Sequence, residues 1–183
     1  MAILNVDEFR GKLLKGGARA NMFECKVNSP GYASGDNELA SFMVRAAQLP
    51  ASTVGLVEVP FRGRIVKLAG DRTFEPWTIT VYNDVDHELR GAFERWSSGL
   101  NTHEGNEGQQ SNNSGIGTYA VDMEVTQLDQ QGSPSSGGGK YTLINAFPTN
   151  VSAIDLDFAQ VGEIETFTVT LEYDYWTNSA ILN

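Results

Sequence analysis

The stretch that decides the fold covers residues 69–84 and reads AGDRTFEPWTITVYND. Its first residues are typical of a turn, because Gly70 can adopt a positive φ and Asp71 can accept bonds from nearby backbone N–H groups. From Trp77 onwards the apolar residues fall on alternate positions, with threonines between them. This period of two predicts a strand with one face in the core and the other toward solvent or a neighbour. The closing Asn-Asp pair predicts a helix start.

Alternating segments of the same kind run through most of the chain. They predict strands over about residues 20–28, 41–49, 53–60, 63–69, 76–83, 118–128 and 140–147. A turn is expected at Pro148-Thr149-Asn150, and after it a strand that points Ile154, Leu156 and Phe158 inward. The last strand has the cleanest alternation, with one face made of Phe167, Val169, Leu171, Tyr173 and Tyr175.

One helix is expected over about residues 85–97, capped by Asn83-Asp84. Its apolar residues repeat at helical spacing and predict one buried face, made of Val85, Leu89, Ala92, Phe93 and Trp96. The pattern as a whole predicts a mainly β fold, an antiparallel β-sandwich or rolled barrel with one flanking α-helix.

Three segments fall outside this pattern. Residues 1–17 form an N-terminal arm with a short helix expected over residues 5–15, because Asn5 can cap it and two glycines follow it. Residues 97–117 are nearly free of apolar side chains, and a loop of that length is functional, mobile or ordered by a neighbouring subunit. Residues 129–140 have the composition of a flexible Gly/Ser linker. All three are expected to lie within one domain that spans residues 1–183.

The composition excludes several classes of protein. Of 183 residues, 23 are Asp or Glu and 13 are Lys or Arg, so the net charge is −10. That balance argues against a protein that grips nucleic acid, although DNA could still slide past it. No apolar run approaches the ~20 residues of a membrane span, and Met1–Phe9 do not form a signal peptide. The single cysteine, Cys25, excludes an internal disulfide framework and fits synthesis in a reducing cytoplasm.

Candidate catalytic patterns are weak. Asp155 and Asp157 alternate on one expected strand face, where a solvated polar surface is a better explanation than a glycosidase pair or a cation site. His87 and His103 have no second ligand at metal-binding spacing. No catalytic residue, metal or cofactor is therefore expected. Cys25, in a strand-like run, is expected to be a buried thiol.

Several motifs together resemble one family, the tail tube proteins of contractile-tailed phages of the T-even type. Besides residues 69–84, the resemblance rests on the helix motif Glu88–Trp96, on Gly105-Asn106-Glu107, and on an aromatic-Pro-Thr-Asn-Val run at Phe147–Val151. The final segment from Glu163 to Trp176 and the turn at Leu49-Pro50-Ala51 also match. These motifs occur in the family's order over about residues 45–176.

The resemblance implies a structural protein of the virion, made in the host cytoplasm. Six copies would form a ring, and rings would stack into a hollow tube that conducts DNA during ejection. The implied partners are other copies of the chain, the surrounding tail sheath protein, and the baseplate and tail terminator proteins at the tube ends. DNA would pass without specific binding.

Two groups of residues are candidate sites. The subunit or ring interface is expected to include Gly70, Asp71, Arg72, Phe74 and Trp77, although Asp71 and Arg72 could instead form a structural ion pair. The lumen is expected to be acidic, so that it repels DNA phosphates weakly along its length, and its candidate acids are Asp122, Glu124, Glu172 and Asp174.

Two alternatives stay open at this point. The tube could belong to a phage-like contractile injection or secretion system that carries protein cargo. More remotely, the chain could be a monomeric β-barrel that binds a small ligand inside. Ring formation would distinguish the tube proteins from the barrel.

Overall fold

The computed structural model describes residues 6, 10–11, 17–33, 35–105, 107–108, 115–134 and 138–180. Its strands are β1 (Phe23–Lys26), β2 (Val44–Ala47), β3 (Ser52–Phe61), β4 (Arg64–Phe74), β5 (Trp77–Tyr82), β6 (Val121–Gln127), β7 (Lys140–Val151), β8 (Thr166–Glu172) and β9 (Tyr175–Asn178). The helices bounded within these ranges are α2 (Asn37–Met43) and α3 (Glu88–Leu100), and Ile116–Thr118 form a 3-10 turn. Val6, Arg10 and Gly11 are also helical. The prediction of a mainly β fold is confirmed.

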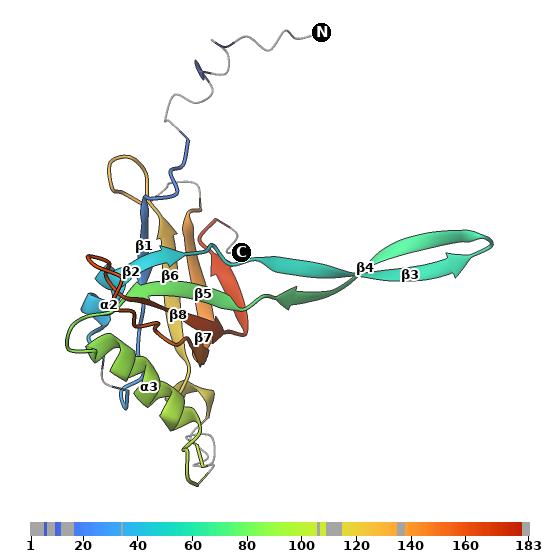
Figure 1. The fold of residues 1–183 in the computed structure, drawn as a ribbon. Helices are drawn as coiled ribbons and strands as arrows, with labels where there is room; N and C mark the ends of the chain where they lie inside the picture. The colour runs from blue at the N-terminus through green and yellow to red at the C-terminus, as the bar shows by residue number, and fades with distance from the viewer. Residues whose placement is uncertain are drawn as a thin grey trace.

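The main sheet is antiparallel and follows the order β1-β6-β7-β8-β5-β2, with β9 paired to β7 (Figure 1). The long strand β7 links two halves of this sheet: its first part pairs with β6 and β9, and its last part pairs with β8. Asn145 lies between the two parts in the left-handed region, at φ 56°. Among the described residues, β1 and β2 end the path without pairing with each other, so the sheet does not close into a barrel.

The core lies between the sheet and the two helices. β5 and β8 pair from Trp77 opposite Leu171 to Tyr82 opposite Thr166, and each strand buries every second side chain. The alternation that predicted these two strands therefore also predicted which side chains they bury. α3 covers this core with Leu89, Ala92, Phe93 and Trp96.

The start of α3 differs from its prediction. The carboxylate of Asp84 accepts hydrogen bonds from the backbone N–H groups of Glu88 and Leu89, so the predicted cap residue does bind the helix end. The helix itself begins only at Glu88, after His87 at φ 52°. Val85 therefore precedes the helix and is 96% exposed, and its placement on the buried face was wrong.

A second helix was missed where a strand was expected. Residues 37–43 form α2, and only Val44–Ala47 of the predicted strand over 41–49 are extended. The carboxylate of Asp36 accepts bonds from the N–H groups of Glu38 and Leu39 and caps the helix. An Asp followed closely by a Glu is a helix-start signal, so the sequence did contain this information.

The predictions for residues 148–165 were wrong in two places. Pro148–Asn150 lie inside β7 and not in a turn; a register shift between these residues accommodates the proline, which cannot donate a ladder bond. Residues 152–165 contain no regular strand, and Leu156 and Phe158 are exposed instead of inward. Ile154 is partly buried against the core.

The turn and loop predictions have mixed outcomes. Gly70 lies within β4 at no positive φ, so residues 69–73 are not a turn; the turn is at Arg62 and Gly63, with φ values of 47° and 82°. β8 ends at Glu172, and Tyr175 begins the separate strand β9. α3 continues to Leu100, which shortens the loop expected from residue 97. Most of the expected N-terminal helix lies outside the described residues, as do residues 106, 109–114 and 135–137 of the two long loops.

Candidate assembly surfaces

The hairpin formed by β3 and β4 projects away from the main sheet (Figure 1). Its strands pair from Ser52 opposite Phe74 out to Phe61 opposite Arg64. Eleven residues at ~3.4 Å each carry β4 over about 35 Å. Nearly every position is exposed, including the large apolar side chains of Val54, Leu56, Val57, Val59, Phe61, Ile65, Val66 and Leu68. Exposed apolar groups that lie together in this way mark an interaction surface.

The base of the hairpin is fixed to the body by aromatic contacts. The ring of Phe74 lies 6.1 Å from that of Tyr173 and 6.5 Å from that of Trp176. Trp176 also donates its indole N–H to the carbonyl oxygen of Ala51, the residue just before β3, the other strand of the hairpin. Because both strands are held at their base, the direction of the hairpin is set by the body of the protein.

A close approach of two glycines marks the inner part of the hairpin. The strand register shifts between Val54 and Leu56, so Gly55 forms a bulge. A Cβ atom at Gly70 would lie 3.1 Å from the carbonyl oxygen of Gly55, which leaves no room for a side chain without a shift. The glycine of the fold-deciding stretch is thus required by strand packing and not by a turn.

The other residues expected at the interface lie in different surroundings. Asp71 and Arg72 are exposed on β4 and, although both are described, form no ion pair with each other. Phe74 is half-buried at the hairpin base. Trp77 is 1% exposed and donates its N–H to the carbonyl oxygen of Gln48, so it belongs to the core of the subunit.

Two of the acids expected in the lumen lie around Asn145, at the junction of the two parts of β7. The Asp122 carboxylate accepts a bond from the Asn145 backbone N–H, and the Asp174 carboxylate accepts one from the Asn145 side-chain amide. These bonds support the left-handed conformation of Asn145. The two acids therefore hold the junction in place and are exposed at the same time.

The other two acids differ in their neighbours. Glu124 pairs with Lys140 at 2.8 Å and with Lys26 at 3.6 Å, across the two strands beside β6. Its charge is compensated within the subunit. Glu172 ends β8 on the half-buried polar face, where the β8 residues Thr166, Thr168 and Thr170 also lie. Burial raises the pKa of Tyr173, and the negative charge of the neighbouring Glu172 raises it further.

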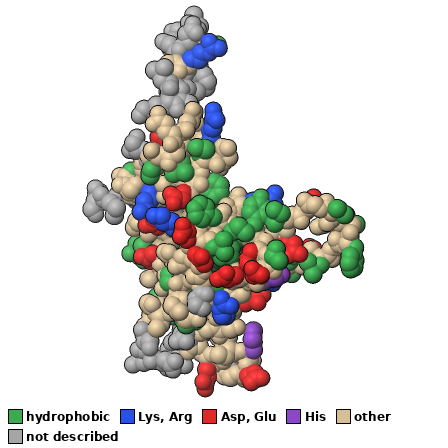
Figure 2. Space-filling view, turned by 90° about the vertical axis from the view of Figure 1, so that its left-hand side faces the viewer, with side chains coloured by type: hydrophobic (Ala, Val, Ile, Leu, Met, Phe, Trp, Pro, Cys, Tyr) green, Lys and Arg blue, Asp and Glu red, His purple; other side chains and the backbone are tan. Residues whose placement is uncertain are grey.

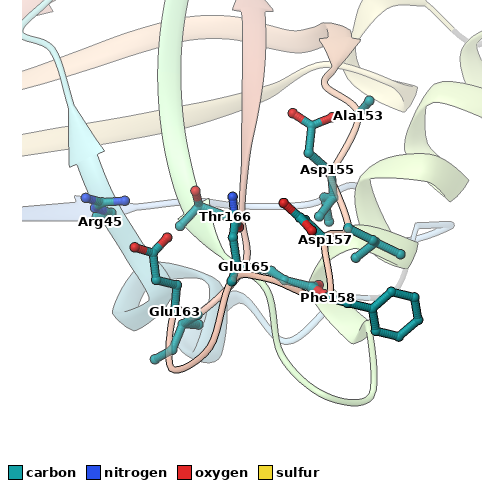
Figure 3. Close-up of a pocket in the computed structure, with 12 residues that line it drawn as sticks. Arg45, Ala153, Asp155, Asp157, Phe158, Glu163, Glu165 and Thr166 are labelled. Atoms are coloured by element: carbon teal, nitrogen blue, oxygen red, sulfur yellow. The ribbon is translucent and has the colours of Figure 1, made fainter.

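A hollow of about 540 Å³ lies on the face that carries residues 152–165 (Figure 3). Its walls include Arg45 from β2 and four acids: Asp155, Asp157, Glu163 and Glu165. Figure 2 views the molecule from this side and shows acidic and apolar side chains intermixed across its middle. The alternating pattern predicted Asp155 and Asp157 on a strand face, and no sequence motif indicated this surface.

The described residues were searched for a metal site and for a reactive nucleophile. They contain no group of three or more His, Cys, Asp or Glu side chains able to hold a metal ion. Burial, with a smaller effect of the Glu24 charge, raises the pKa of Cys25 to about 12, so this buried thiol is not a nucleophile at neutral pH. None of the described helices combines the length and apolar character needed to cross a membrane.

Known proteins similar to this chain agree with its architecture. The family model described as phage tail tube protein matches residues 18–179. Tail tube protein gp19 of Enterobacteria phage T4 is 32% identical over 165 residues, which are 87% of this chain and 90% of that protein.

Solved structures share the fold at low sequence identity. A chain in the cryo-EM structure of the anti-feeding prophage baseplate gives a TM-score of 0.61 at 15% identity, over 91% of this chain and 98% of that chain. A chain in the extended sheath-tube complex of the extracellular contractile injection system PVC gives 0.59 at 14% identity, over 98% and 100%.

The family match covers most of the chain, and the T4 relative supports it independently at the level of sequence. The expected family, the expected place in the virion and the expected absence of enzymatic activity are confirmed by these matches. This chain belongs to the phage tail tube protein family and is a structural component of the phage tail.

Proposed function

We propose that six copies of this protein form a ring and that the rings stack into the hollow inner tube of a contractile tail. The observation that carries this proposal is the β3–β4 hairpin, which exposes large apolar side chains on both of its faces. Burying one such side chain contributes about 1.5–3 kcal/mol. A neighbouring subunit would supply that burial at several positions at once.

Open sheet edges support the same assembly. β1, β2 and β9 have unpaired sides among the described strands. Exposed edges invite uncontrolled pairing, which a closed ring prevents. In this proposal the whole chain is one domain, its sheet is the wall of a rolled sandwich, and each copy lends strands to a continuous barrel around the lumen.

The partners follow from that geometry. The tube would lie inside a tail sheath protein, with baseplate and tail terminator proteins at its ends, and DNA would pass through it during ejection. The likeness to the anti-feeding prophage and to PVC shows only a shared fold, so protein cargo stays the alternative. The phage relative at 32% identity favours DNA.

We further propose that the lumen is acidic and does not bind DNA. Six copies at −10 each give −60 formal charges per ring, and a closed channel concentrates that field. Asp122, Asp174 and Glu172 remain the better candidates, because Glu124 is paired with two lysines. Asp122 and Asp174 also hold Asn145, so they are changed to Asn, which keeps an acceptor oxygen, and Glu172 is changed to Lys. These changes should leave tubes intact and slow genome delivery, most strongly at low salt. Delivery at the normal rate would show that these charges do not act on the DNA.

Electron microscopy and sizing of the purified protein over a range of concentrations test the assembly directly. Rings and open tubes are expected. A protein that stays monomeric under all conditions contradicts the proposal.

Hydrogen exchange tests whether segments become ordered on contact. The hairpin between Ala51 and Phe74 and the loop between Ser97 and Gly117 should exchange fast in the monomer and slowly in the tube. Ordering a loop costs roughly 1–2 kcal/mol per residue, so a neighbour must supply compensating contacts. The linker at residues 132–139 should exchange fast in both states. Equal protection of the hairpin in monomer and tube would remove it from the interface.

A further inference from the structure

Residues 152–165, called the acidic loop below, combine negative charge with exposed apolar side chains. The loop contains four acids and no Lys or Arg. Its large apolar residues are exposed, with Leu156 at 80% and Phe158 at 108%. A merely solvated loop has no need of large apolar side chains, so this composition indicates a binding surface.

Both ends of the acidic loop are fixed to the sheet. The Ser152 N–H donates to the carbonyl oxygen of Thr168, and the Arg90 guanidinium donates to the Ser152 carbonyl. At the other end, the Asn83 side-chain amide donates to the Glu165 carboxylate at 2.9 Å. Figure 3 shows Asp155 and Asp157 on one side of the hollow and Glu163 on another, with the Phe158 ring turned outward. The two ends of the loop and the Glu165 carboxylate are thus held in place before any partner arrives.

The tip of the β3–β4 hairpin has the opposite chemistry. Its turn contains Arg62 and Arg64 beside the exposed Phe61, and the Arg62 guanidinium lies 5.4 Å from the Phe61 ring centre. Four of the 13 basic residues of the chain lie within residues 52–74, against two acids. The hairpin therefore carries +2 in a chain of net charge −10.

The two surfaces cannot meet within one copy. Strand β5 separates them, because the hairpin ends three residues before Trp77, whereas Glu165 bonds to Asn83, just after Tyr82. In Figure 1 the hairpin points to one side of the sheet, and the orange-red segment before β8 lies on the other. Complementary surfaces at opposite ends of one chain make a head-to-tail contact, which is the kind that generates rings and filaments.

We propose that the hairpin tip, Phe61–Arg64, of one copy docks on the acidic loop of a neighbouring copy. Arg62 and Arg64 donate charge-assisted hydrogen bonds to the carboxylates that surround the hollow. Phe61 packs against the apolar side chains of the loop, with Phe158 as the main contact. This contact rests on the proposed ring-and-tube assembly and assigns it one specific pair of surfaces.

Charge reversal with rescue tests the pairing. One variant carries Arg62→Asp and Arg64→Glu, and the other carries Asp155→Lys and Glu163→Lys. Neither the Asp155 nor the Glu163 carboxylate accepts a hydrogen bond from the described residues, so these two changes should not alter the shape of the loop. Like charges across the interface should raise the concentration needed for tube formation about 100-fold in each variant. A mixture of the two variants should assemble near the wild-type concentration, because each tip then meets a loop of opposite charge. A control with Glu38→Lys and Asp86→Lys, two exposed acids outside the acidic loop and the hairpin, should assemble normally.

Cross-linking gives an independent measurement. Copies with Arg62→Cys are mixed with copies with Glu163→Cys and treated with a short bismaleimide, while the native Cys25 stays buried. A covalent dimer that forms only in the mixture supports the contact. No such dimer and no rescue, while wild-type tubes form, overturns the contact and leaves the assembly proposal intact. If wild type forms no tubes, the assembly proposal fails, and the dimer measurement at high concentration alone decides for or against the contact.

A third outcome concerns another occupant of the acidic loop. If the Asp155→Lys and Glu163→Lys variant forms tubes like wild type but no longer binds the sheath protein, the loop is a sheath contact. That result overturns the contact between copies.

Discussion

The pairs β5–β8 and β3–β4 have similar sequences and opposite surroundings. Both are antiparallel pairs rich in β-branched residues. In β5–β8 every second side chain is buried, whereas in β3–β4 nearly all are exposed. Alternation sets which side chains share a face of a strand, but what covers that face depends on the rest of the molecule. In the proposed tube, another copy covers the second pair.

The largest effect is expected in the buried pair. Phe167 is 1% exposed, and its ring lies 6.2 Å from that of Phe93 and 5.7 Å from the Arg90 guanidinium. Phe167→Ala should lower the free energy of unfolding by about 3–5 kcal/mol, because it removes buried surface and leaves a cavity. Urea unfolding of the monomer measures this. A loss below about 1 kcal/mol would mean that the pair is not the core of the subunit.

In the hairpin, the corresponding change should act on assembly. Phe61→Ala removes a ring that is 62% exposed in the monomer. The change should weaken tube formation by about 1.5–3 kcal/mol, roughly a 10- to 150-fold rise in the assembly concentration, and leave urea unfolding of the monomer nearly unchanged. Pelleting at increasing protein concentration measures the first effect. Loss of monomer stability with normal assembly would reverse the comparison.

Much of the fold could be predicted because local patterns and tertiary packing agree there. Trp77, Ile79 and Val81 alternate and are buried, and Asp84 binds the start of α3 as a cap residue should. The errors arose where the same pattern had two meanings. Leu156 and Phe158 alternate with acids as in a strand, yet no neighbouring strand pairs with them, so they remain exposed.

The candidate interface was only partly predictable for the same reason. The fold-deciding stretch contains both Gly70 and Trp77, which lie in the hairpin and in the core respectively. A motif identifies the family without separating residues that fold the subunit from residues that join subunits. The acidic loop was found only in three dimensions, since the contact proposed for it depends on the hollow and on its position away from the hairpin.

A smaller effect on the free energy of unfolding should come from Cys25, a buried titratable group of the main sheet. Cys25 on β1 is 2% exposed, and burial raises its pKa from 9.0 to about 12. Below pH 9 the thiol is neutral in both folded and unfolded chains and adds no pH dependence. Above it the unfolded chain loses the proton first, so stability falls by up to about 1.4 kcal/mol per pH unit until the folded pKa is reached. The step from pH 8 to pH 10 should therefore cost the wild type about 1.4 kcal/mol more than it costs Cys25→Ala. Equal losses in both proteins would mean that the thiol is accessible to water.

The smallest effect is expected for a hairpin residue in the monomer. Val59 lies opposite Val66, is 42% exposed and has only its cross-strand neighbours to pack on. Val59→Ala should change the free energy of unfolding of the monomer by less than about 0.5 kcal/mol, as surface substitutions usually do. Phe167→Ala should be measured under the same conditions. The ratio of the two losses in free energy of unfolding then expresses the contrast between the strand pairs. A loss above about 1.5 kcal/mol would show that the hairpin already packs against something in the monomer, and the apolar side chains along it would then belong to the fold of the subunit and not to its assembly.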